Sequence, residues 1–320
     1  MFKKATVLTF AVLMLVICCG AAMGQLNGEN LKGDFGLGAG SQAPPGVWTG
    51  FMYYRYKVDQ INDLNGTKVI TSGDTTINAG LALVNVVTKK KFLGANYGFM
   101  VGVPVLNFAL ETPHFASNPN AGIGDMYVQP LQLGWQTKKA DIIAGYAFFA
   151  PTGRYAVGAD NNTGLGMWSH ELSLGTTVYP DKKKEWNVAA LTAVEFHTDK
   201  QGTNGTHVGN LLTVEGGLGK KLLHGGINTG LVYYAQWKLS DDRFGARAPT
   251  LLVRGRNSSA ALGPEFTMAL ASKEKGKVYG LMTFRYYKEL YAHTTTKGNS
   301  LVFSLIIPIK PLKIPPPPGP

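Results

Sequence analysis

Charged side chains recur on one side of several extended stretches of this sequence. Successive side chains of a strand point to opposite faces, so residues an even number of positions apart share a face. Carboxylates and guanidinium groups gathered on one face can bind polar groups of another molecule, or pair with one another and stiffen the fold. The charged residues predicted to share the polar face are Arg55, Glu171, Glu195, Glu215, Glu265, Arg285 and Glu289.

Catalysis would need a nucleophile or a metal beside an acid or a base. Ser169 and His170 are adjacent in sequence, so on a strand they point to opposite faces and cannot act together. Glu195 and His197 share a face, which permits acid–base chemistry, but no nucleophile accompanies them. The six histidines show no metal-ligand spacing. We therefore expect no catalytic residue, no metal site and no cofactor.

The chain begins with a predicted leader. Two lysines at positions 3 and 4 precede an apolar run over residues 5–19, and the small residues Ala22 and Gly24 suit a signal peptidase. A signal peptide is therefore predicted over residues 1–24, with a lipoprotein leader as the alternative. The two cysteines of the chain lie inside this leader, so the exported protein is expected to form no disulfide.

Twelve stretches after the leader alternate apolar residues with small or polar ones, as strands do. They run for roughly 10 residues or more, the length that a tilted strand needs to cross hydrocarbon. No later stretch has 18 uninterrupted apolar residues, which excludes membrane-spanning helices. We predict an all-β fold, a closed antiparallel transmembrane β-barrel over residues 47–309. The predicted strands are 47–58, 78–88, 95–105, 124–136, 141–150, 167–179, 186–197, 208–220, 226–238, 256–271, 277–290 and 299–309.

The connections between these strands divide into two kinds. Short turns that carry lysines fall at one end of the predicted barrel, and six longer connections fall at the other. An even strand number puts both barrel termini on one side, as in bacterial outer-membrane barrels with periplasmic ends. We therefore predict export to the bacterial outer membrane, with membrane lipids as neighbours. The lysine-bearing turns are 89–91, 138–139, 182–184, 220–221 and 272–277.

The two ends of the exported chain lack strand periodicity. Residues 25–46 are glycine-rich and are predicted to form an irregular periplasmic segment that could plug the lumen. Residues 310–320 are proline-rich and are predicted to form a periplasmic tail outside the sheet, because proline cannot donate to a ladder. The formal net charge is +11, but the lysines are divided among separate turns without an aromatic platform. We therefore predict no nucleic-acid partner.

Three further residues have two interpretations each. Arg154 lies in the loop over residues 150–166 and would enter a solute path if that loop folds inward. A plain extracellular loop is the alternative. Pro130 and Pro264 lie inside predicted strands, where a missing donor predicts a kink or bulge. Such a kink could open a lateral route through the wall, or be a local distortion without function.

Three sequence blocks carry a family resemblance: GIGDMYVQPLQLGW over Gly122–Trp135, YAFFAPTGRY over Tyr146–Tyr155 and NTGLGMWSHE over Asn162–Glu171. With these blocks the chain resembles the outer-membrane transporter family named for the meta-pathway of phenol degradation, also called the SphA-like family. The resemblance implies a monomeric twelve-stranded barrel with inward-folded loops. It also implies uptake of small molecules, often hydrophobic or aromatic.

These observations together predict a passive outer-membrane channel for small solutes. In that interpretation the charged residues of the polar face form a constriction that sets selectivity. One alternative is an outer-membrane barrel enzyme that acts on lipids, and another is a structural or adhesive barrel with a plugged lumen. The expected partners are a small-molecule solute and, during biogenesis, the outer-membrane assembly machinery.

Overall fold

The computed structural model describes residues 26–71, 75–112, 115–117, 120–248, 254–272 and 276–313. The predicted signal peptide, residues 1–24, lies outside the described residues. None of the described helices is long and apolar enough to cross a membrane.

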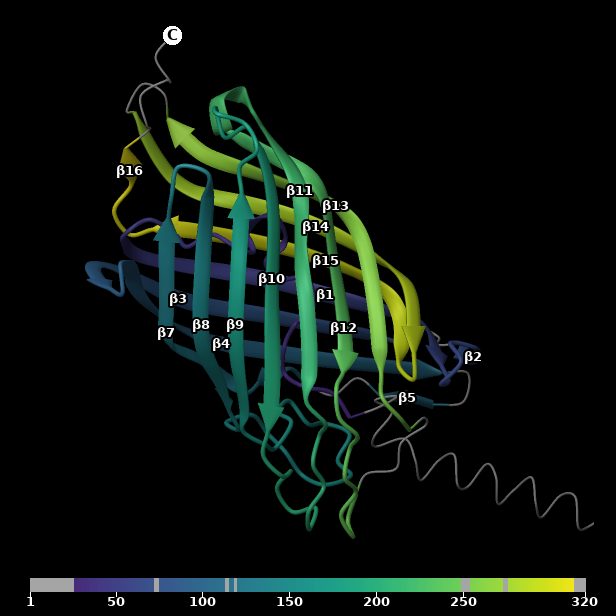
Figure 1. Cartoon of the computed structure of the whole chain (residues 1–320). Helices are drawn as coiled ribbons and strands as arrows, with labels where there is room; N and C mark the ends of the chain where they lie inside the picture. The colour runs from purple at the N-terminus through teal and green to yellow at the C-terminus, as the bar shows by residue number, and fades with distance from the viewer. Residues whose placement is uncertain are drawn as a thin grey trace, which may run out of the picture.

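Twelve long antiparallel strands form one closed β-barrel (Figure 1). Each pairs with its neighbours in the chain, β1 pairs with β15, and β13–β14 pairing completes the ring. All twelve predicted strands and the closed barrel are confirmed. The barrel strands are β1 (Gly46–Asn62), β3 (Thr76–Phe92), β4 (Ala95–Thr112), β7 (Met126–Gln136), β8 (Ala140–Ala150), β9 (Ser169–Val178), β10 (Trp186–His197), β11 (Leu211–Leu222), β12 (Ile227–Lys238), β13 (Ser258–Ser272), β14 (Lys277–His293) and β15 (Thr296–Pro308).

Four short strands extend this sheet. β2 (Lys68–Thr71) pairs with β1, while β5 (Phe115–Ser117) and β6 (Gly122–Ile123) pair with β4. β16 (Leu312–Lys313) pairs with β14 at the barrel end. The prediction that the tail over residues 310–320 stays out of the sheet is therefore wrong for Leu312 and Lys313, and residues 314–320 lie outside the described residues. Leu312 and Lys313 precede the proline run and keep their N–H groups.

The barrel has two unequal ends, as the connections predicted. Short turns lie at the end where the described C-terminus emerges, and longer loops gather at the opposite end (Figure 1). Two boundaries differ from the prediction. Lys220 and Lys221 lie within strand β11, which ends at Leu222, and the turn itself is the 3-10 helix η3 (Leu223–Gly225). Residues 291–298 form no long loop, because β14 extends to His293 and β15 begins at Thr296.

Burial alternates along the strands and separates an interior face from an outer face. On β1, Met52, Tyr54 and Tyr56 are buried and belong to the largest apolar cluster. Phe51 and Arg55, at the intervening parity, are exposed. The interior of this wall is therefore aromatic and apolar rather than uniformly polar.

Pro130 lies at a bulge, as predicted. The pairing of β7 shifts register there on both sides, between Gly98 and Met100 of β4 and between Val128 and Leu131 toward β8. The extra residue reverses the alternation, so that Gln129 and Gln132 both face inward and their amides hydrogen-bond at 2.9 Å.

Pro264 produces no bulge, so that part of the prediction is wrong, and the observed change is a local distortion of one ladder. Its register with β12 continues unbroken through the Leu231–Pro264 pair. On the β14 side, Leu262 and Glu265 keep partners in the same register while Gly263 and Pro264 have none. The missing N–H thus interrupts one ladder locally without inserting a residue.

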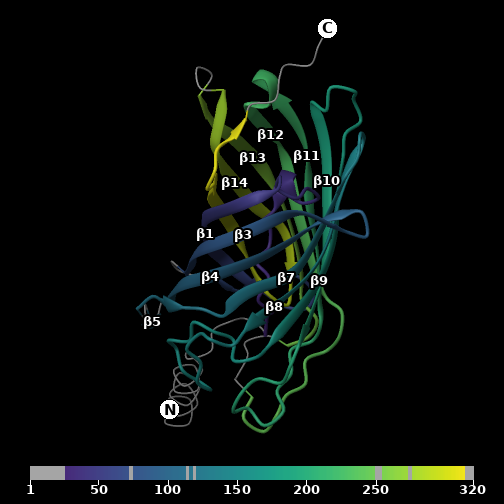
Figure 2. The ribbon, with the colours of Figure 1, turned by 90° about the vertical axis from the view of Figure 1, so that its left-hand side faces the viewer.

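Residues 26–45 precede β1 and lie inside the barrel (Figure 2). We call them the lumen segment. Their only regular element among the described residues is the 3-10 helix η2 (Gly36–Gly38). η2 contacts β10, β11 and β12 from the interior.

Candidate functional site

The lumen segment enters among the long loops and leaves beside the short turns. At its first end, Leu26 packs with Met167 and Val208, and its carbonyl accepts a hydrogen bond from Lys238 Nζ at 2.7 Å. Lys238 also pairs with both carboxylate oxygens of Asp242, at 2.7 and 2.8 Å. A buried cation is thereby neutralised and fixes the start of the segment.

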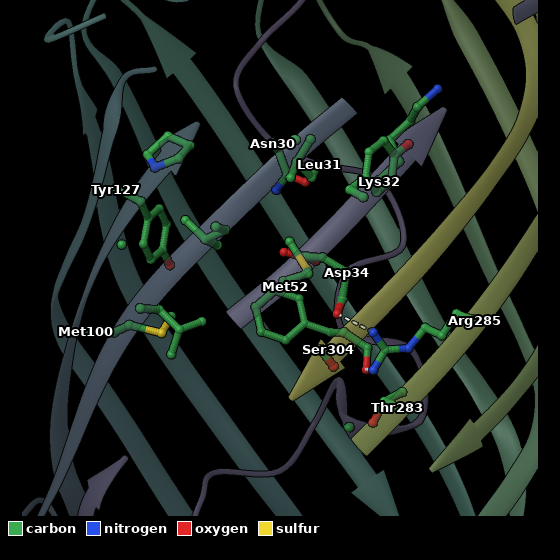
Figure 3. Close-up of a pocket in the computed structure, with 18 of the residues that line it drawn as sticks. Asn30, Leu31, Lys32, Asp34, Met52, Met100, Tyr127, Thr283, Arg285 and Ser304 are labelled. Atoms are coloured by element: carbon green, nitrogen blue, oxygen red, sulfur yellow. Dashed lines mark hydrogen bonds between the residues drawn. The ribbon is translucent and has the colours of Figure 1, made fainter. Parts of the chain in front are cut away.

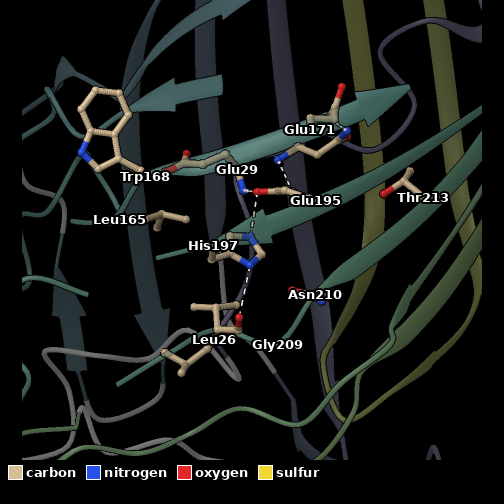
Figure 4. A network of polar contacts seen from close by, with 12 residues as sticks. Leu26, Glu29, Leu165, Trp168, Glu171, Glu195, His197, Gly209, Asn210 and Thr213 are labelled. Carbon is tan, nitrogen blue, oxygen red and sulfur yellow. Dashed lines mark hydrogen bonds and ion pairs between the residues drawn. The ribbon is translucent and has the colours of Figure 1, made fainter. Parts of the chain in front are cut away.

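Two inward-facing carboxylates bind the next residues of the segment (Figure 4). The Glu195 carboxylate accepts the backbone N–H groups of Glu29 at 2.6 Å and Asn30 at 3.3 Å. The Asn30 side-chain amide donates to Glu171 on the neighbouring strand. Both carboxylates are buried, so each finds in the segment the polar partners that burial requires.

Glu289 is a third anchor. Its carboxylate pairs with Lys32 Nζ at 2.8 Å and accepts the hydroxyl groups of Tyr56 at 2.7 Å and Tyr234 at 2.9 Å. It also accepts the Gly298 N–H at 2.8 Å. Four donors around one buried carboxylate make a rigid anchor for Lys32, because charge-assisted hydrogen bonds are the strong ones.

Arg285 holds the middle of the segment (Figure 3). Its guanidinium donates to the carbonyl oxygens of Asp34 at 2.7 Å and Phe35 at 3.0 Å, and pairs with Glu265 at 2.6 Å. Glu265 also accepts the N–H of Leu37 at 2.9 Å. Five guanidinium donors in a fixed fork suit this three-way arrangement, which a lysine would not reproduce.

Close approach at this anchor requires glycine in the segment. Gly36 has φ +51°, and a Cβ there would lie 2.1 Å from Glu265 Oε2. Glu215 completes the set from β11 by accepting the Phe35 N–H at 3.3 Å. The segment therefore fits against this wall with little room for side chains.

At the opposite end the contacts are neutral or singly charged. Ser41 donates to Asp141 at 2.9 Å, and the Gln42 amide donates to Gln132 at 3.0 Å. Trp48 Nε1 donates to the Pro44 carbonyl at 2.9 Å, where the segment turns into β1. The segment is thus held along its whole course.

The structure sorts the predicted pore-lining residues into two groups. Glu171, Glu195, Glu215, Glu265, Arg285 and Glu289 face the interior, where each contacts the lumen segment. Arg55 was predicted to face the interior, and this is wrong. Tyr54 and Tyr56 occupy the interior face of β1, so Arg55 falls on the outer face. Polarity alone misassigned the parity because the interior of this strand is aromatic.

Arg154 remains exposed at the loop end and does not line the lumen cavity. Its Nε donates to the Asn161 carbonyl at 2.7 Å within its own loop. The neighbouring buried acid is Asp125, which accepts the N–H groups of Gly153 at 2.8 Å and Leu165 at 2.7 Å. The prediction that Arg154 enters the solute path is therefore not supported by its position.

A cavity of about 890 Å³ lies in the lumen beside the segment. β1, β3 and β4 contribute apolar side chains to it, among them Met52, Leu81, Met100 and Leu106. In Figure 3, Met100 and Tyr127 face the cavity across from Asp34 and Arg285. The cavity therefore has an apolar wall and a polar wall, and the lumen segment supplies part of the latter.

Two acids of the lumen segment have perturbed pKa values. Burial raises the pKa of Asp34 to about 6, against the lowering effect of a hydrogen bond with Glu215. Burial and a hydrogen bond with Asp125 raise the pKa of Glu29 well above its usual range. Both shifts arise because the barrel interior disfavours the charged carboxylate.

Glu195 and His197, which the sequence places on one face, contact each other in the structure. His197 Nε2 lies 2.9 Å from Glu195 Oε1, and its Nδ1 lies 3.2 Å from the Val208 carbonyl oxygen. Ser169, the partner of His197 across β9–β10, has no hydrogen bond to either ring nitrogen. Both imidazole nitrogens are therefore already engaged. Among the described residues, no group of three or more histidine, cysteine, aspartate or glutamate side chains could hold a metal ion.

Solved structures of similar fold are outer-membrane barrels. The COG4313 outer membrane channel from Pseudomonas putida F1 is 15% identical, with a TM-score of 0.69 over 87% of this chain and 99% of that chain. The β domain of the Bordetella autotransporter BrkA is 13% identical, with a TM-score of 0.43 over 82% and 98%. At 15% identity, the likeness to the P. putida channel establishes the fold alone.

No curated protein matches the chain. The family comparison is more informative, because its match runs through most of the barrel. Residues 58–305 match the family described as "Putative MetA-pathway of phenol degradation", so the resemblance in the sequence blocks is confirmed and the chain belongs to this family.

Proposed function

We propose that this chain is a passive channel of the bacterial outer membrane through which small hydrophobic or aromatic molecules cross down their concentration gradient. The cavity of about 890 Å³, with its apolar wall from β1, β3 and β4, is the observation that carries the proposal. Its volume exceeds that of a single aromatic molecule, and ligand sites of this size are typically apolar with a few polar groups. The similar P. putida protein is named an outer membrane channel, which supports the channel part of the proposal.

The apolar wall supplies the attraction. A single aromatic ring buries roughly 150 Å² of apolar surface, which corresponds to about 4 kcal/mol of transfer free energy. Binding of this strength is enough to draw a solute from water and weak enough to release it again. The lumen segment supplies polar backbone and side-chain groups to the opposite wall of the cavity, so hydrated polar solutes meet a polar, protein-lined path.

The entry route remains a prediction. Pro130 forms a bulge beside Met100 and Gln132, both of which line the cavity. We propose that solutes pass through the wall at this bulge. A disulfide between Val101→Cys and Val128→Cys, which replace a cross-strand pair, would close the route. Uptake that is unaffected by this disulfide would rule the route out.

A structural or adhesive barrel with a plugged lumen is the second candidate. The observation that favours it is the lumen segment, which buried charged groups hold from Lys32 to Leu37. A barrel enzyme acting on lipids has less support, because His197 is engaged at both ring nitrogens. We further propose that the barrel works as a monomer without a cofactor and is inserted by the outer-membrane assembly machinery.

Uptake of labelled toluene by cells with and without the protein separates these candidates. A channel for apolar solutes increases the initial rate of toluene uptake and leaves maltose uptake unchanged. A plugged structural barrel increases neither rate, and that result would sink the transport proposal. Heat-modifiable migration on a denaturing gel shows in the same cells that the barrel is folded.

A further inference from the structure

Basic side chains gather on the outer face of three neighbouring strands, β1, β15 and β14. These strands lie side by side in the barrel (Figure 1). The residues are Arg55, Lys57, Lys288 and Lys297, and we call them the outer basic patch. On the other barrel strands, the described residues include no outward-facing lysine or arginine near the long-loop end. The charges are thus concentrated on one quarter of the circumference.

Strand register brings the patch together. Lys57 pairs with Asn299, and Asn299 pairs with Lys288, so the three lie on one line across the sheet. Neighbouring strands are about 4.8 Å apart, which places the backbones of the two lysines about 10 Å apart. Lys297 lies two residues before Asn299 on β15.

The patch borders the apolar band of the same strands, on the side toward the long loops. Phe51 and Phe284 belong to this band and are exposed on the outer face. Tyr53 and Tyr286 form the edge of this band toward the long loops. Tyr286 donates its hydroxyl hydrogen to Asn299 at 2.9 Å. Tyrosines at a band edge mark the interface between hydrocarbon and headgroups. The outer basic patch therefore stands at headgroup height.

A small hollow of about 190 Å³ lies within the patch, lined in part by Lys288 and Lys297. β14 and β15 cease to pair beyond Lys288–Asn299, and the Glu289 carboxylate bridges to the Gly298 N–H. Lys297 Nζ donates to the Leu290 carbonyl at the rim, at 2.7 Å. The hollow thus results from a local parting of two strands.

Two acids line the hollow, but the Glu289 carboxylate belongs to the interior, where Lys32 neutralises it. Asp59 also lines the hollow, and its carboxylate accepts the Asn299 side-chain amide at 2.8 Å. With four cations and one anion, the surface keeps a net charge of about +3 at neutral pH. An anionic ligand is therefore favoured over a cationic one.

We propose that the outer basic patch binds the phosphate groups of lipid A in the outer leaflet of the outer membrane. This rests on the membrane location in the proposed function but not on transport. The long-loop end of the barrel faces the leaflet that carries lipid A. Lysine and arginine bind phosphate strongly at a membrane surface. Two phosphates on one headgroup match a patch whose lysines are spread over three strands, whereas a single-phosphate lipid would use only part of it.

The test is lipid binding by the purified barrel, measured by native mass spectrometry. The probes are diphosphoryl lipid A and phosphatidylglycerol. We compare the wild type with the triple variant Lys57→Gln, Lys288→Gln, Lys297→Gln. The matched control carries Lys89→Gln, Lys90→Gln and Lys277→Gln at the opposite end of the barrel. Heat-modifiable migration confirms that each variant folds.

The wild type and the control are expected to bind diphosphoryl lipid A more tightly than phosphatidylglycerol. Each removed charge is expected to weaken lipid A binding about fivefold, so the triple variant loses roughly 100-fold. Equal lipid A affinity in the triple variant and the wild type would overturn the proposal. It would also be overturned if the wild type bound phosphatidylglycerol as tightly as diphosphoryl lipid A. Neither result would affect the toluene uptake on which the transport proposal depends.

Discussion

Replacing Arg285 with methionine is expected to release the lumen segment from the barrel wall. Arg285 donates charge-assisted hydrogen bonds to the carbonyl oxygens of Asp34 and Phe35. Each such bond contributes about 1.5–3 kcal/mol, so their loss costs the docked segment about 3–6 kcal/mol. The docking equilibrium should therefore shift by roughly 100- to 20,000-fold.

The assay follows the segment with a single cysteine. The sequence has cysteines only at positions 18 and 19, inside the predicted signal peptide, so an introduced cysteine would be unique. Gly38 is suitable, because a Cβ there meets no atom within 4 Å. A maleimide carrying a 5 kDa polymer, which is too large to enter the barrel, should label Gly38→Cys faster when Arg285→Met is added.

Channel recordings give a second readout of the same event. In planar bilayers, Arg285→Met should show larger or more frequent openings than the wild type. Lys277→Gln, at the end of the same strand, removes a cation without touching the segment and should behave as the wild type. If Arg285→Met gives wild-type labelling rates and wild-type openings, the anchoring role of Arg285 is refuted.

The remaining predictions concern the cavity, the segment and pH. Gly36→Ala should also release the segment, because its Cβ would lie 2.1 Å from Glu265 Oε2. Polymer labelling of Gly38→Cys measures this release, and an unchanged labelling rate would contradict the close fit. The raised pKa of Asp34 means that the docked state binds more protons than the released state between about pH 4 and 6, so docking should weaken as pH rises through this window. Labelling should therefore be faster at pH 7 than at pH 4.5, once corrected for thiolate content on a free peptide. Asp34→Asn should flatten this dependence, and a slope that it leaves unchanged would assign the effect to other groups.

The barrel could be predicted from the sequence because alternate residues of a strand face the barrel interior and the outer surface, so their polarity alternates. Even Pro130 was predictable, since a proline lacks the N–H that a ladder requires. Pro264 has the same chemistry but its missing donor affects only the β14 side, and a single sequence does not reveal which neighbour a strand's N–H would face. The bulge and the unbulged ladder therefore look alike at the sequence level.

Arg55 shows where alternation fails. The prediction took polar residues as the interior set, but the interior of β1 is formed by Met52, Tyr54 and Tyr56. The lumen segment makes the barrel interior partly a protein core, so aromatic residues face inward. In the membrane placement that we propose, Arg55 lies at the headgroup edge of the apolar band and not in hydrocarbon, which allows it to face outward.

The course of the lumen segment could not be predicted. Its residues show no periodicity, and its contacts join positions far apart in the chain, such as Lys32 with Glu289 and Leu37 with Glu265. The inward carboxylates were visible in the sequence, but their partners were not. One feature of the sequence indicates that the segment enters the lumen. Inward-facing carboxylates need hydrogen-bond donors, and a glycine-rich segment without strands offers its backbone N–H groups.

The central claim is that apolar solutes cross through the cavity beside the lumen segment. Its most direct test is the initial rate of toluene uptake by cells that carry Met100→Trp, which fills the cavity from β4. The control is Phe99→Trp, one residue away on the outer face of the same strand. We predict that Met100→Trp lowers uptake toward that of cells without the protein while Phe99→Trp keeps the wild-type rate. Equal rates in the two folded variants would contradict transport through this cavity.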